Sequence, residues 1–401
     1  MTAWTPQVFT PWPAHPGVLM ARVAARSAAF DGTSAAGGAS VLVGSAAGHD
    51  RDRVVLGARG ELLERLGNVL AGREAEAAAG TPAGTVGTRH ELAGAGVLVL
   101  APEERPEGRR LWVRGRTHRG EPVLVAAGAA FLQHRPPPGC ERLPRTGSTG
   151  VASHPDPEAA ARHAAWEVLE RDLVRRSWFG LTEGAPRRVR AVLPPALAEL
   201  ARDQAFLVTA FLLPAPAGAA CAVACVHRVD GTGQTFGARC GPGTSVPELV
   251  EKAVYEALMV RWSMGTEVAR RTWEQWRGQS PPTTAVQHAL WAYHRQDSLR
   301  LWGVARESGD GPSQAPPAGA PDAPPDVPAE RPFPADADAG PGSGAVDPVR
   351  VLAGHTGRDV VLVDTTGRPA REAGVRVVRV LAPGARQLPS GTGPGHPHPF
   401  G

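Results

Sequence analysis

The stretch Glu167-Val168-Leu169-Glu170-Arg171-Asp172 determines how this chain is interpreted, and a shorter version occurs earlier as Glu61-Leu62-Leu63-Glu64-Arg65. Each copy lies in a helix-forming run and places two carboxylates three residues apart, so both lie on one face of a helix. Carboxylates stacked in this way repel each other unless a cation lies over them. Two such helices therefore predict a cradle for magnesium and a polyphosphate, without a glycine-rich phosphate loop.

A third acidic position, Glu256, follows Lys252 by four residues in a later helical run. One Glu-x-x-Glu-Arg copy alone is typical of a solvated helix face, where an intrahelical ion pair contributes about 0.3 kcal/mol. The apolar neighbours of the two copies, such as Leu62 and Trp166, make a carboxylate cluster costly without cations. Because Mg²⁺ commonly joins one or two carboxylates to substrate phosphates, we expect the three helices to share bound ions.

The composition restricts the class of protein. With 401 residues the chain can bury a large core, and its net charge of +4 is spread without a basic block, which argues against nucleic acid. The cysteines form no C-x-x-C pair, so we expect reduced thiols rather than a zinc site. No apolar run is long enough to span a bilayer and no signal pattern begins the chain, so we expect a soluble, cytoplasmic protein that does not bind membranes.

Apolar periodicity predicts helices alternating with strands. Residues 1–30 are expected as a strand or irregular edge, 31–50 as a Gly/Ala/Ser-rich loop and 134–145 as a Pro-rich connector. Asp156 as N-cap and Pro157 in the first turn predict the start of the helix that carries the second acidic copy. Helices are expected at 54–78, 157–178 and 247–263, and then around Trp273, Trp276 and Trp291. Strands are expected at 96–100, 111–113, 122–127, 188–193, 206–213, 220–228, 359–364 and 375–381.

The segment 306–347 consists mainly of Pro, Ala, Gly and Asp. It has too few large apolar residues to offset the entropy of ordering, so we expect a disordered insertion. The chain is therefore predicted to form an α/β domain with mixed β-sheets flanked by helices over 1–305, interrupted by this Pro/Ala-rich insertion. Strands and a Pro-rich tail over 348–401 are expected to complete the domain.

The motifs together resemble the YcaO superfamily, and within it the azoline-forming cyclodehydratases. Segment 57–66 is similar to the family's Ser-Ala-x-Gly-Glu-x-x-Glu-Arg helix. Ser148-Thr149-Gly150-Val151-Ala152, followed by 167–172, resembles its STG-x-A and E-x-x-E-R-D element. Segment 252–261 resembles R-A-x-x-E-x-x-Q-x-R, and segments 363–366 and 374–384 resemble its closing strands. The motifs occur in the family's order and cover nearly the whole chain outside 306–347.

This resemblance implies a YcaO-type ATP-binding domain and an ATP- and Mg²⁺-dependent cyclodehydratase acting on a ribosomally made precursor peptide. In the family a Cys, Ser or Thr side chain attacks the preceding backbone amide, ATP phosphorylates the oxyanion, and loss of phosphate leaves an azoline ring. The family's metal-binding acids carry over to Glu61, Glu64, Glu167, Glu170 and Glu256. The same acids contact the nucleotide in this scheme, together with Ser148, Arg171, Lys252 and Arg261. The family's Pro-rich tail, which projects into the active site, corresponds to Pro397 and Pro399.

Three positions depart from the family pattern. Gly57 stands where the family has Ser, Ala47 where Lys is usual and Met259 where Gln is usual. Each change removes a polar group expected near the nucleotide, at about 1–3 kcal/mol of binding free energy. Two alternatives therefore stay open beside cyclodehydration. One is a YcaO enzyme that forms a thioamide or amidine, and the other is a catalytically silent scaffold subunit.

Two further alternatives are weaker. A hydrolase using Ser148 with His154 or His163 lacks the strained Gly-x-Ser-x-Gly turn that exposes such a nucleophile. The tail departs from strict Pro-x-Pro-x-Pro spacing, so a frayed, low-complexity end is the alternative to an active-site tail.

The sequence also suggests partners. No leader-peptide-binding domain is evident before the first motif, so we expect a separate partner protein to capture the precursor peptide. Trp262, Trp273 and Trp276 are interpreted as core packing rather than a peptide groove. The same Trp-rich region would suit the face of a homodimer.

Overall fold

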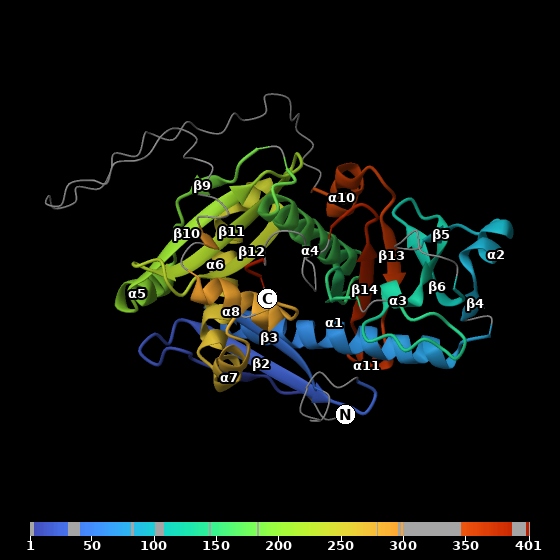
Figure 1. Cartoon of the computed structure of the whole chain (residues 1–401), viewed down its shortest axis with the longest axis horizontal. Helices are drawn as coiled ribbons and strands as arrows, with labels where there is room; N and C mark the ends of the chain where they lie inside the picture. The colour runs from blue at the N-terminus through green and yellow to red at the C-terminus, as the bar shows by residue number, and fades with distance from the viewer. Residues whose placement is uncertain are drawn as a thin grey trace, which may run out of the picture.

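One helix, α4 (Pro157–Trp178), runs between two β-sheets near the middle of the chain's computed structural model (Figure 1). The structure describes the residues 4–30, 41–81, 84–100, 108–143, 146–182, 184–278, 280–295, 298–299, 346–386 and 398–400. Within these ranges the strands form sheets of three, four and seven strands. The predicted insertion lies outside the described residues up to position 345, and so does Pro397.

The first sheet is an antiparallel meander covered on one face by a long helix. Its elements are β1 (Gln7–Phe9), β2 (Leu19–Arg26), β3 (Val41–Gly48) and the helix α1 (Arg51–Ala77). The helix lies so close to β3 that a Cβ at Gly44 would be only 2.2 Å from the carbonyl oxygen of Ala58. Glycine at this position therefore permits the contact. The expectation of a loop over 31–50 is therefore wrong for residues 41–48, which form the strand β3. The small residues there allow the helix to pack closely on the strand and do not form a turn.

The second sheet has helices on both faces. Its strands, in spatial order, are β12 (Thr235–Pro242), β11 (Ala219–Arg228), β10 (Phe206–Leu213) and β9 (Arg187–Val189). The helices α5 (Pro195–Asp203) and α6 (Val246–Met264) pack on one face, and α4 packs on the other. Glycine again permits close contact, since a Cβ at Gly237 of β12 would lie 2.2 Å from the carbonyl oxygen of Ala253 of α6.

The third sheet joins distant parts of the chain. Its strands are β5 (Val99–Leu100), β7 (Pro122–Ala126), β6 (Arg110–Thr117), β13 (Val361–Asp364), β14 (Arg376–Leu381) and β8 (Val151–His154) in that spatial order, with β4 (Thr85–Gly87) beside β6. The short helices near it are α2 (Arg89–Gly94), α3 (Ala127–Ala130) and α11 (Arg368–Glu372). Strands β13 and β14, from residues 361–381, lie between β6 and β8, so a late segment of the chain pairs with strands from its first half.

Helix α4 is held at its C-terminal end by a buried acid. The carboxylate of Asp172 accepts hydrogen bonds from Arg176 Nε and from His355 Nε2, both at 2.6 Å, and His355 lies on α10 (Pro348–Thr356). Asp172 has no exposed surface. Because a buried carboxylate is costly without partners, this contact fixes α10 against α4 and so fixes the orientation of the acidic helix.

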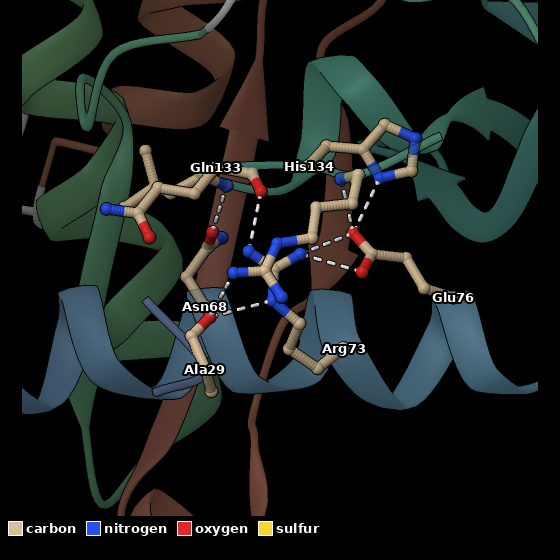
Figure 2. Close-up of polar contacts among 8 residues, drawn as sticks. Ala29, Asn68, Arg73, Glu76, Gln133 and His134 are labelled. Atoms are coloured by element: carbon tan, nitrogen blue, oxygen red, sulfur yellow. Dashed lines mark hydrogen bonds and ion pairs between the residues drawn. The ribbon is translucent and has the colours of Figure 1, made fainter. Parts of the chain in front are cut away.

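The far end of α1 is fastened by a second polar cluster (Figure 2). Glu76 accepts hydrogen bonds from Arg73 Nη1 at 2.7 Å and from the backbone N–H of Arg135 at 2.6 Å, and it contacts His134 Nδ1 at 3.1 Å. Arg73 also donates to the carbonyl oxygens of Ala29 and Gln133. The cluster ties two loops to the helix, one at Ala29 and one at 133–135, where Gln133 has a left-handed φ of 53°.

Two short helices pack beside α6, and the chain end packs against the second of them and against β12. Trp276 of α7 (Glu267–Trp276) is 7% exposed and packs with Trp273, next to α8 (Ala285–His294), which confirms core packing for these two tryptophans. Trp262 instead lines a cavity of about 190 Å³ with Phe9 and Arg22. Phe400 at the chain end is buried against Phe236 of β12.

Most predicted elements are present, with shifted ends. The acidic helices and the helix at 247–263 are confirmed, and Asp156 caps α4 by accepting the N–H groups of Glu158 and Ala159. The expected strand at 96–100 is shorter and follows a helix, α2, that the pattern did not indicate. Helix α10 was also not predicted. No helix among the described residues is both long and apolar enough to cross a bilayer.

Candidate functional site

The five predicted glutamates come from three helices that meet the edges of three sheets. Glu61 and Glu64 lie on α1, Glu167 and Glu170 on α4, and Glu256 on α6. Strands β3, β8 and β12 are each at the edge of their sheet in the described structure. Edge strands have backbone N–H groups without strand partners, and such groups need acceptors when they are buried.

Every one of the five carboxylates accepts a backbone N–H from a strand edge or the loop before it. The donors are Ser45 for Glu61, Ser153 for Glu64 (3.1 Å), Gly150 for Glu167 (3.0 Å), Cys240 for Glu170 (3.0 Å) and Ala238 for Glu256 (3.3 Å). One oxygen of each side chain is thereby fixed in place. This common arrangement brings acids from distant parts of the sequence to the junction of the three sheets.

The second oxygen differs among the acids. Glu61 uses it for Arg65 Nη2 at 2.6 Å, so both of its oxygens are engaged. Within the described structure, Glu64 Oε2 and Glu167 Oε1 have no hydrogen-bond partner. Glu170 Oε1 and Glu256 Oε1 lie 3.7 and 3.8 Å from nitrogen atoms of Arg171. Four acids therefore offer an oxygen that is free or only loosely paired.

Burial and mutual repulsion disfavour the charged forms of these acids. Burial, reinforced by the charge of Glu167, raises the pKa of Glu64 to about 8 against the hydrogen bond from Ser153. Burial also raises the pKa of Glu170 to about 7, although Arg171 and Arg239 oppose the shift. The pKa of Glu167 is raised by burial as well. Added cations would relieve this repulsion and favour the charged forms.

The cluster suits magnesium only with a bridging ligand. In the described part of the chain, no three acidic, histidine or cysteine side chains surround one point closely enough to hold a metal ion by themselves. Mg²⁺ usually keeps one or two carboxylates and completes its shell with water and substrate phosphates. Carboxylates with one oxygen anchored and the other available fit that chemistry, with phosphate oxygens joining the separate acids.

Arg239 is a site residue that the sequence analysis missed. It lies on β12 between Ala238 and Cys240, whose N–H groups bind Glu256 and Glu170. Burial acts against its charge, but Glu170, Glu256 and Glu167 together raise its pKa. The residue nevertheless keeps exposed surface, so its side chain reaches solvent next to the backbone groups that hold Glu256 and Glu170. The signal available in the sequence was a single arginine in a strand of otherwise small or apolar residues.

The other predicted basic residues are placed differently. Arg171 lies between Glu170 and Glu256, with its nitrogen atoms 3.7 and 3.8 Å from the two carboxylates. Lys252 is half-exposed and pairs with Glu248 at 2.7 Å. Arg261 is not brought to the acids: its guanidinium donates to the carbonyl oxygen of Gly233 and lies 4.0 Å over the ring of Phe206. One helix thus carries Lys252 and Arg261 on different faces.

The remaining predicted residues lie around this cluster or at the chain end. Ser148 is half-buried just before Gly150, and within the described structure no hydrogen bond joins it to His154 or His163. Pro399 is buried between His398, which stacks on His288 with ring centroids 3.8 Å apart, and Phe400. Met259 lines the 190 Å³ cavity with Ser45 and Met20, so its apolar side chain faces a space next to Glu61.

The sequence matches a known protein family over most of its length. Residues 47–386 match the model of a family described as YcaO cyclodehydratase, ATP- and Mg²⁺-binding. The match spans well over half of the chain and contains all five glutamates. No curated protein matches the sequence significantly.

Solved structures share the fold at low sequence identity. A heterocyclase in complex with substrate and cofactor is 17% identical with a TM-score of 0.63, covering 95% of this chain and 50% of that chain. YcaO from Methanopyrus kandleri bound with AMPPCP and Mg²⁺ is 19% identical with a TM-score of 0.58, covering 98% and 91%. The E. coli microcin synthetase McbBCD complex with pro-MccB17 bound is 13% identical with a TM-score of 0.56, covering 96% and 89%. The present chain thus spans about half the length of the heterocyclase.

Proposed function

This chain belongs to the YcaO family, whose members are ATP- and Mg²⁺-binding enzymes, and we propose that it is a peptide cyclodehydratase. The proposed reaction joins a Cys, Ser or Thr side chain to the preceding backbone carbonyl carbon of a ribosomal precursor peptide, giving an azoline ring. Bound Mg-ATP supplies the phosphoryl group with which the amide oxygen leaves as phosphate. The resemblance of the sequence motifs to this family is confirmed by the family match.

The single observation that carries the proposal is the convergence of Glu64, Glu167, Glu170 and Glu256 from three helices with one carboxylate oxygen anchored and one available. These four residues would hold the magnesium ions through their available oxygens. Glu61, with both oxygens engaged, would hold β3 and Arg65 in place and act on the ions indirectly.

The basic residues would divide two tasks. Arg171, between Glu170 and Glu256, keeps these acids apart and oriented, while Arg239 reaches solvent among the acids and is suited to meet phosphate oxygens. Lys252, on the turn of α6 before Glu256, is suited to a more distant phosphate contact. In this proposal Arg261 serves the packing of α6 against β10 and no longer the nucleotide.

The neighbours' substrates support a peptide as the substrate class. One structural neighbour was solved with its substrate, and the microcin synthetase complex was solved with pro-MccB17 bound. We therefore propose that a precursor peptide enters the site beside Glu64 and Glu167, presented by a separate leader-binding protein.

The test is ATP-dependent phosphate release by the purified chain together with a candidate precursor and its partner protein, followed by mass spectrometry of the peptide. Cyclodehydration predicts loss of one water per ring and one phosphate released per ring. Exchange of oxygen for sulfur or nitrogen would instead support thioamide or amidine formation. Failure of the protein and of its complex to bind Mg-ATP would support a silent scaffold, for which Gly57, Ala47 and Met259 are the sequence arguments.

A further inference from the structure

A buried arginine that was given no role from the sequence lies in the sheet beside the acidic cluster. Arg379 of β14 is fully buried, opposite Val151 in the pairing of β14 with β8. Its Nη1 donates to the carbonyl oxygen of Gly147 at 2.7 Å and its Nη2 to Thr146 Oγ1 at 2.8 Å. Nε has no partner within the described structure. Both hydrogen bonds of the guanidinium therefore go to the segment 146–150, which precedes β8.

That segment is clamped between β14 and α4 at its last residue. The N–H of Gly150 donates to Glu167 Oε2 at 3.0 Å, and its carbonyl oxygen accepts the N–H of Val380 at 2.7 Å. Gly150 has a left-handed φ of 81°, and a Cβ there would lie 2.6 Å from both Val168 Cγ2 and Val380 O. The backbone of 146–150 thus has little freedom, and a shift at Gly147 would change the donor that anchors Glu167.

The charge of Arg379 also acts on Glu167. Burial lowers the pKa of Arg379 to about 10, with Glu167 opposing the shift, so the guanidinium keeps its charge at neutral pH. In return, Arg379 is one of the cations that lower the pKa of Glu167, which burial raises. Within the described structure Arg379 has no carboxylate in direct contact, which is costly for a buried guanidinium, so its hydrogen bonds to Thr146 and Gly147 are its main compensation.

We propose that Arg379 is a positioning residue of the nucleotide site: it fixes the 146–150 segment and thereby sets the orientation of Glu167. The inference rests on the proposed function. It also explains how Ser148 is presented, because Thr146 and Gly147 on one side and Gly150 on the other are held by named contacts. Arg379 acts through the backbone and Glu167 and need not touch the nucleotide.

Arg110 provides a matched control on the same sheet. It is 5% exposed, lies on β6 and donates to Glu141 at 2.9 and 3.0 Å. None of the five glutamates is among its contacts in the described structure. A purely structural role for Arg379 predicts that Arg379→Lys and Arg110→Lys behave alike apart from the size of the stability loss.

The experiment uses the full chain and the variants Arg379→Lys, Thr146→Val and Arg110→Lys. Two quantities are measured: hydrogen exchange of the 146–151 backbone without ligand, and the dissociation constant of a non-hydrolysable ATP analogue with saturating Mg²⁺. We expect faster exchange at 146–151 and about tenfold weaker binding for Arg379→Lys and Thr146→Val, with both quantities unchanged for Arg110→Lys. If Arg379→Lys does not fold, Thr146→Val decides by the same two measurements.

The outcomes separate the inference from the function on which it rests. If the wild type binds the Mg-ATP analogue and Arg379→Lys and Thr146→Val bind it with the same affinity, the positioning role alone is overturned. Equal weakening in Arg110→Lys would overturn it as well, because the effect would then follow from general loss of stability. No binding of the Mg-ATP analogue by the wild-type chain would overturn the proposed function and the inference together.

Discussion

Glu170 accepts a hydrogen bond of 3.0 Å from the backbone N–H of Cys240, and two residues earlier on β12 the N–H of Ala238 binds Glu256. Successive outward N–H groups of one edge strand therefore align acids from two different helices. On the other side of the site, two edge strands hold acids of one helix: Ser45 of β3 binds Glu61 and Ser153 of β8 binds Glu64, both on α1. The acids thus satisfy the strand edges of the three sheets, and the strand edges in turn position the acids.

Glu170→Gln tests whether this acid serves ligand binding rather than stability. The amide oxygen can still accept the N–H of Cys240, while a buried charge with a raised pKa is removed. We expect a melting temperature equal to or above that of the wild type, and Mg-ATP binding weakened at least tenfold. Thermal unfolding and calorimetric titration measure the two quantities.

The matched control is Glu158→Gln on the same helix, where the side chain is exposed and pairs with Arg116. This variant should keep the melting temperature and the Mg-ATP affinity of the wild type. Glu170→Gln with unaltered Mg-ATP affinity would contradict the assigned role.

The raised pKa values predict a proton linkage. Because the pKa of Glu64 is about 8 and that of Glu170 is about 7, both acids are partly protonated at neutral pH when no cations are bound. Since their ordinary pKa of 4.5 is lower, the folded state binds more protons than the unfolded state between these values. Stability of the cation-free protein should therefore fall as pH rises from about 5 to about 8.

Binding of Mg-ATP should release protons and tighten as pH rises through the same window. The number released follows from titration heats in buffers of different ionisation enthalpy. Glu64→Gln should reduce this number. Equal heats in all buffers for the wild type would show that the acids are already ionised.

Two arginines distinguish the refined site from the one predicted by sequence. Arg239→Gln should lower the rate of ATP-dependent phosphate release by about tenfold or more at nearly unchanged stability, because the side chain is exposed among the acids. Arg261→Gln should instead destabilise the fold by about 1–3 kcal/mol, since a buried donor to Gly233 is lost, and spare Mg-ATP affinity. If Arg261→Gln instead lowered phosphate release and Arg239→Gln lowered only stability, Arg261 rather than Arg239 would be the residue that contacts the nucleotide.

The cluster at the far end of α1 should matter for stability alone (Figure 2). Burial opposes the charge of Glu76, but hydrogen bonds from His134, Arg135 and Arg73 outweigh it and lower its pKa. Its contribution is therefore present above pH about 4.5 and is lost as pH falls below that value. We expect Glu76→Gln to cost about 1–3 kcal/mol of unfolding free energy at neutral pH.

Urea unfolding at neutral and acidic pH measures this loss, which should shrink in acid. Mg-ATP affinity of Glu76→Gln serves as the control and should equal that of the wild type. Weaker binding by this variant would indicate that the two ends of α1 are coupled.

The sequence predicted the acidic helices because a carboxylate pair with apolar neighbours leaves a strong local pattern. It could not indicate β3, where Gly44 serves contact with Ala58 rather than a turn, because that need arises only from tertiary packing. Arg239 and Arg379 were missed for a similar reason. Arg239 is a single arginine in its strand and Arg379 is one of two in β14, and the role of each depends on which helix covers that strand. Arg261 was predicted to contact the nucleotide only because it matches the motif. In the structure it lies on the face of α6 that is turned toward Gly233, and its guanidinium donates to the carbonyl oxygen of that residue.

The most direct test of the central claim, that acids from three helices hold a triphosphate through divalent ions, is calorimetric binding of a non-hydrolysable ATP analogue with and without Mg²⁺. We predict binding only when Mg²⁺ is present, and loss of that binding in Glu167→Gln and Glu256→Gln proteins that remain folded. Equal binding of the analogue in the presence of a chelator, or intact Mg²⁺-dependent binding by both variants, would contradict it.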